Sequence, residues 1–133
     1  MITRIFQGLA WLIVGGLVIE FYLAGAALFG ATTFQPHRAL GVGLAAAILL
    51  LLLVALIARP GRRVVGLAAV LTGLTILQVL LPSLRSGLPW VSALHALNAA
   101  ALASVTVTIA RASGPAEASR SREALLVTAE TTR

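Results

Sequence analysis

Two histidines are the side chains of this sequence best suited to chemistry. His37 lies in FQPHRALG and His95 in WVSALHALNA, each near the start of a long apolar run. Imidazole ligates transition metals and haem iron, carries protons and forms hydrogen bonds as donor or acceptor. The 133-residue chain has no further histidine and no cysteine, which excludes disulfides, thiolate metal sites and iron–sulfur clusters. A metal or cofactor site in this sequence therefore depends on these two imidazoles.

The composition is that of a membrane protein. Hydrophobic residues make up 59% of the chain and charged residues only 11%, whereas soluble domains are about a quarter charged. A membrane-spanning helix needs about 20 mostly apolar residues. The sequence predicts four such spans, at about residues 5–29, 37–58, 64–84 and 89–110.

The breaks between the spans are short, so consecutive helices are expected to be antiparallel neighbours. The predicted fold is therefore an all-α integral membrane four-helix up-and-down bundle over residues 1–111. Residues 112–133 are polar and rich in small side chains, which predicts a flexible cytoplasmic tail. The AGA triplet at residues 24–26 also fits a signal-peptide cleavage site, but Glu20 inside the apolar stretch favours a retained helix. The sequence contains no convincing internal repeat.

The basic residues predict the orientation in the membrane. The net charge of +6 comes from ten arginines with no lysine, and only Arg38 and Arg85 fall on the sparsely charged side. The positive-inside rule then places both termini and the middle loop in the cytoplasm, with the expected location a bacterial cytoplasmic membrane. Because the arginines flank apolar runs, we expect the partner to be the lipid bilayer and not nucleic acid.

The polar residues within the spans gather in the outer half of the membrane. With about 1.5 Å of rise per residue, Gln78 and His95 are each about 9 Å below the outer helix ends. Glu20 and Asn98 are each about 14 Å below them. The same count places His37 about 8 Å shallower than His95. Ionisable groups at such depths face the protein interior or a wet cavity and are candidates for a functional site.

The spacing of these residues predicts which helix face they occupy. Ser92, His95 and Asn98 repeat every three residues, as do Thr72, Thr75 and Gln78, and residues three or four apart share a helix face. We expect both faces to point into the bundle. Glu20 has Gly16 and Ala24 four residues to either side, which permits close approach of a neighbouring helix.

Haem is the most specific cofactor that this pattern suggests. A bis-histidine haem needs one imidazole from each of two facing helices, and the second and fourth helices are diagonal in an up-and-down bundle. His37 and His95 are then the axial ligands, and Arg38 pairs with a propionate. Gly41, four residues after His37, leaves room for a ring edge. Glu20, Gln78 and Asn98 line the pocket or relay protons.

The HRALG motif at residues 37–41, with His95 on the fourth helix, resembles one four-helix half of a haem A synthase. This resemblance implies that the second and fourth helices each supply a haem-ligating histidine. Phe34 occupies the place of the glutamate that precedes the first histidine in that family, so the resemblance gives no support for oxidative chemistry. The layout is also similar to uncharacterised small four-span bacterial membrane proteins, which implies an architecture and no activity.

Other functions remain open on the sequence alone. The same residues suit a structural hydrogen-bond network, a quinone or small-ligand site, or a metal ion held by two histidines and Glu20, although Glu20 is deep relative to His37. A non-catalytic accessory or scaffold subunit of a larger membrane complex, or a homo-oligomer, is a further alternative. No serine–histidine–aspartate set, zinc-protease motif or phosphate loop is present, so the sequence assigns no catalytic residues.

Overall fold

The computed structural model describes residues 2–113. It consists of helices α1 (Ile2–Leu28), α2 (Gln35–Ala58), α3 (Arg62–Leu80) and α4 (Pro89–Ala112), with a short 3-10 helix, η1 (Leu81–Leu84), that extends α3. Four helices, the third counted with η1, are long and apolar enough to cross a membrane. The predicted all-α four-helix bundle is thus confirmed. From residue 114 onward, the predicted tail lies outside the described residues.

Local sequence signals explain where the helices begin and end. Pro36 and Pro89 lie in the first turns of α2 and α4, where the missing N–H would have had no partner within the helix. α2 ends at Ala58 and is capped by Arg59, whose backbone is left-handed (φ 47°) and whose N–H bonds to the Ala55 carbonyl. Gly61 then adopts φ 125°, which only glycine reaches without strain, so the chain reverses within three residues.

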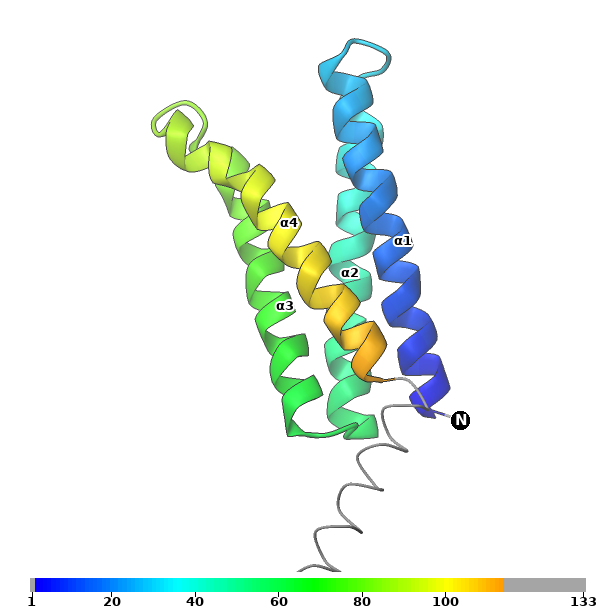
Figure 1. Ribbon diagram of the computed structural model, residues 1–133. Helices are drawn as coiled ribbons and strands as arrows, with labels where there is room; N and C mark the ends of the chain where they lie inside the picture. The colour runs from blue at the N-terminus through cyan, green and yellow to red at the C-terminus, as the bar shows by residue number, and fades with distance from the viewer. Residues whose placement is uncertain (1, 114–133) are drawn as a thin grey trace, which may run out of the picture.

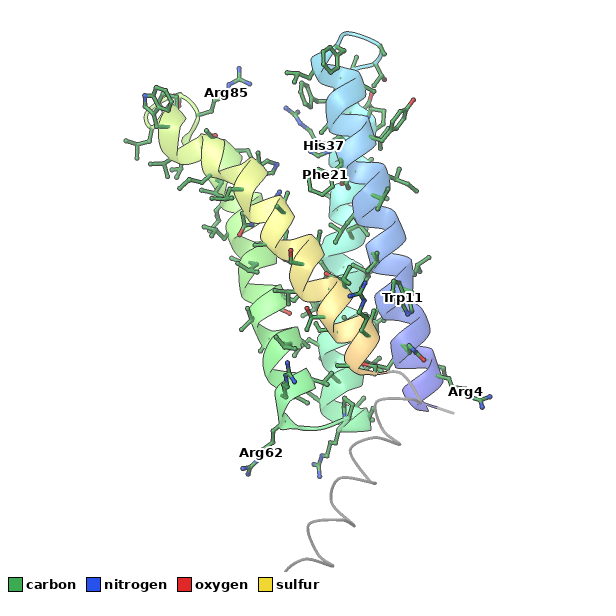
Figure 2. All side chains as sticks on the ribbon, in the orientation of Figure 1. Arg4, Trp11, Phe21, His37, Arg62 and Arg85 are labelled. Carbon is green, nitrogen blue, oxygen red and sulfur yellow. The ribbon has the colours of Figure 1, made fainter. Side chains whose placement is uncertain are left out.

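The helices form a ring in which each packs against two neighbours. α1 contacts α2 and α4, and α3 contacts α2 and α4, so α2 and α4 are diagonal and have no backbone contact within residues 2–113. The α1–α2 and α3–α4 connections lie at one end of the bundle, here called the double-loop end (Figure 1). The opposite end carries Arg4 and Arg62, whereas Arg85 lies at the double-loop end (Figure 2). The two hairpins diverge toward the double-loop end (Figure 1).

The buried faces of α1, α2 and α3 follow alternating spacings of three and four residues, as in coiled coils, and that of α4 follows similar spacings less regularly. The apolar core consists of Phe6, Ala10, Ile13 and Leu17 on α1, Leu44, Ile48, Leu51 and Ala55 on α2, Val64, Ala68 and Leu71 on α3, and Leu102, Ile109 and Ala110 on α4. Large hydrophobic side chains elsewhere on the helices are exposed, which suits contact with lipid. The core therefore forms one narrow seam along the bundle axis.

Candidate functional site

The core seam changes from apolar to polar toward the double-loop end. Its three-and-four spacing continues from Leu17 to Glu20, from Leu44 back to Gly41 and His37, and along the other two helices in the same way. We call the resulting group the polar core cluster: Glu20, His37, Gln78, His95 and Asn98. The predicted inward orientation is confirmed for Glu20, Gln78, His95 and Asn98, since Glu20 and Asn98 are buried and the other two are part-buried, and His37 is part-buried as well.

Glu20 of α1 and His37 of α2 are in direct contact through their side chains. The Glu20 carboxylate contacts Nδ1 of His37, and the backbone carbonyl oxygen of Glu20 lies 3.3 Å from the same nitrogen. Both neighbours accept hydrogen bonds, so Nδ1 carries a proton and donates it. In the neutral ring, the lone pair is then on Nε2. Glu20, only 8% exposed, thereby gains a partner within the bundle.

Two glycines let α1 and α2 approach this closely. A Cβ added at Gly41 would lie 2.8 Å from Oε1 of Glu20, so the carboxylate uses the space that the missing side chain leaves. The room beside Gly41 expected for a ring edge is thus taken by Glu20. A Cβ at Gly16 would lie 2.5 Å from Cδ2 of Leu44, which confirms the expected close approach near Glu20.

His95 of α4 is held by Gln78 of α3 in a corresponding way. Nδ1 of His95 lies 3.0 Å from the backbone carbonyl oxygen of Gln78, and Nε2 lies 3.3 Å from the Gln78 side-chain nitrogen. Since the carbonyl accepts and the amide donates, the proton is on Nδ1 and the lone pair on Nε2. The Asn98 amide donates to Oε1 of Gln78 at 2.6 Å and to the Leu74 carbonyl at 2.9 Å.

The two hairpins repeat one arrangement. In each, a histidine directs Nδ1 at the backbone carbonyl of the residue 17 positions earlier, Glu20 for His37 and Gln78 for His95. The side chain of that earlier residue also contacts the histidine. A sequence search for repeats misses this likeness because the surrounding apolar residues differ. The equal spacing of the polar pairs is the signal that reveals it.

The two imidazoles meet across the bundle diagonal. Their ring centroids are 6.3 Å apart and their planes are inclined at 77°. The expectation that His37 lies well above His95 is therefore wrong. The expectation assumed helices of equal tilt with level ends. The α3–α4 hairpin is instead inclined relative to α1 and α2 (Figure 1), so each residue of α4 changes the height by less than the rise along the helix axis. Phe34, which sequence reasoning did not assign to the site, packs edge-on to His37 with centroids 6.2 Å apart.

The remaining candidates lie outside the cluster or at its edge. Arg38 is exposed and makes no ion pair within the described part of the chain, where Glu20 pairs with His37 instead. Thr72 and Thr75 donate to carbonyls four residues earlier and line an open apolar groove of about 350 Å³ between α2 and α3, which neither histidine borders. Residues 2–113 contain no group of three carboxylate or imidazole side chains arranged for a metal ion.

Comparison with known proteins gives a family match without an assigned activity. The model of a family of unknown function (DUF6220) matches residues 20–85. This segment begins at Glu20, contains His37 and Gln78, and ends before His95. No curated protein and no solved structure matches the chain, so these comparisons do not show the resemblance to haem A synthase that the sequence motifs suggest.

Proposed function

We propose that the protein is a small membrane cytochrome-like protein that binds one b-type haem between α2 and α4, with His37 and His95 as axial ligands. The observation that carries this proposal is that both histidines are held in the same tautomer, with the proton on Nδ1. A metal-ligating histidine almost always donates its other ring N–H to a carboxylate or a backbone carbonyl. Nδ1 of His37 meets Glu20 in this way and Nδ1 of His95 meets Gln78, so Nε2 is the unprotonated nitrogen of each neutral ring, the one able to bind a metal.

The separation of the rings also fits a shared iron. A metal–imidazole bond is about 2.0 Å long, so imidazoles on opposite sides of one iron hold their centroids about 6 Å apart. The observed centroid distance is 6.3 Å. Steeply inclined ring planes, here at 77°, are compatible with axial ligands because each ring lies on its own side of the macrocycle.

The surroundings suit a flat amphipathic cofactor. α2 and α4 are diagonal, and the hairpins diverge toward the double-loop end, so a macrocycle between the histidines would not have to separate two packed helices (Figure 1). Arg38 follows His37 directly and is exposed, where its guanidinium would meet a propionate. Bound haem would supply one-electron transfer, while Glu20 and Gln78 would orient the two ligands.

Orientation is part of the proposal. We place the double-loop end outside the cytoplasm and both termini inside, because the arginines concentrate at the opposite end. The cluster then lies in the outer half of the membrane, within reach of electron donors or acceptors in the bilayer or outside the cell.

The test is an optical spectrum of the detergent-purified protein, reduced minus oxidised, with a pyridine haemochrome assay for stoichiometry. We expect one low-spin b-type haem per chain, lost in His37→Ala and in His95→Ala. Ser92→Ala, on the His95 face of α4 but outside the cluster, should keep it. A protein purified from haem-supplied cells without stoichiometric haem would refute the proposal, and so would haem retained in both histidine variants. The cluster would then be a structural network or a site for another ligand.

A further inference from the structure

The two histidines differ in what their Nε2 atoms meet. Nε2 of His37 has no hydrogen-bond partner among residues 2–113, whereas Nε2 of His95 lies 3.3 Å from the side-chain nitrogen of Gln78. An imidazole nitrogen has one lone pair, which either accepts a hydrogen bond or binds a metal. We infer that the Gln78 amide competes with iron for His95 and thereby controls cofactor affinity. This inference rests on the proposed function.

The orientation of the Gln78 amide is fixed from two sides. Its oxygen accepts a 2.6 Å hydrogen bond from Asn98, which is itself held by the Leu74 carbonyl and is 7% exposed. The nitrogen end of the amide is therefore the end that faces His95. Because the His95 proton is on Nδ1, bonded to the Gln78 carbonyl at 3.0 Å, Nε2 is the acceptor of this contact.

The two ends of Gln78 thus act in opposite directions. Its backbone carbonyl favours ligation, since it holds the proton of His95 on Nδ1 and leaves Nε2 unprotonated. Its side chain opposes ligation, since an iron at Nε2 requires the amide to turn away. Glu20 has no N–H in its side chain and imposes no such competition on His37. Substituting the Gln78 side chain should therefore strengthen ligation by His95 without disturbing its tautomer.

The first measurement is a haem titration of the purified full-length protein, prepared from haem-starved cells and followed by Soret absorbance. Gln78→Leu and Gln78→Ile remove the donor, roughly keep the size of the side chain and add no group that binds iron. Each should bind haem about threefold to tenfold more tightly than the wild type, which corresponds to one hydrogen bond in a membrane interior. Thr75→Val, one turn earlier on α3 and bonded only to the Leu71 carbonyl, should match the wild type.

The outcomes separate this inference from the proposed function. One outcome is that the protein binds haem only when both histidines are present, while both Gln78 variants bind it no more tightly than the wild type. That result would refute the competition by Gln78 and leave the cytochrome proposal standing. Wild-type protein that binds no haem, or binds it equally well in His37→Ala and His95→Ala, would overturn both.

A second measurement needs no haem. In ¹⁵N NMR spectra of the histidine side chains, both rings should be in the Nδ1–H tautomer, and Gln78→Leu should shift Nε2 of His95 but not Nε2 of His37. A His95 ring with its proton on Nε2, or an unchanged Nε2 shift in the variant, would refute the hydrogen bond on which the competition depends.

Discussion

At the scale of single residues, the site depends on a side chain that is absent. Gly41 gives the Glu20 carboxylate its place against His37, because a Cβ there would lie 2.8 Å from Oε1. Gly41→Ala should push Glu20 off His37 and, relative to Gly43→Ala on the same helix, lower the free energy of unfolding by about 1 kcal/mol, within the range for a polar contact in a membrane protein. Unfolding in an SDS titration measures this change.

Gly43→Ala is the matched control for Gly41→Ala. Gly43 lies two residues further along α2, and a Cβ there meets nothing within 4 Å. Alanine in an open helical position is favoured over glycine by about 0.5–1 kcal/mol, so this variant should be as stable as the wild type or more so. Equal stability of the two variants would mean that Glu20 relaxes without losing His37.

At the scale of elements, α1 and α2 pack through a small residue against a large one. A Cβ at Gly16 would lie 2.5 Å from Cδ2 of Leu44, so Gly16→Ala forces Leu44 out of its rotamer at a cost of about 0.5–1.5 kcal/mol. In a Leu44→Ala background the same change should cost nothing. A double-mutant cycle of unfolding free energies measures this coupling.

Gly15→Ala separates this effect from helix propensity. Gly15 is adjacent to Gly16 but exposed, and its added Cβ would meet nothing within 4 Å. We expect no coupling between Gly15→Ala and Leu44→Ala. If the effects of Gly16→Ala and Leu44→Ala also proved additive, the two helices would have adjusted their separation so that Leu44 no longer meets the new methyl group.

The helices and their inward faces could be predicted from the sequence, but the heights of the side chains could not. Hydropathy and the prolines at 36 and 89 mark the spans, and three-residue spacing gives the faces of Gln78 and His95. Depth counting failed for His37 because it depends on helix tilt, which packing between hairpins decides. The contact between Glu20 and His37 was not predicted for the same reason, since the count placed these two residues at different depths.

At the scale of the whole molecule, two hairpins of similar design meet at the polar core cluster. Each contributes one histidine anchored 17 residues back along the chain, and the cluster lies near the double-loop end. If the cluster binds haem as proposed, the side of the membrane that this end faces decides which redox partners can reach it. The arginine distribution predicts that it faces outward, away from the cytoplasm.

Single cysteines test this orientation cleanly, because the chain contains none of its own. Thr32→Cys and Ser86→Cys place one exposed thiol in each connection of the double-loop end, and Pro60→Cys places a half-buried thiol in the α2–α3 connection. A membrane-impermeant thiol reagent should label the first two in intact cells and the third only after lysis. The reverse pattern would put the histidine pair in the cytoplasmic half of the membrane, where its electron donor or acceptor would be a cytoplasmic protein or a lipid-soluble carrier of the inner leaflet.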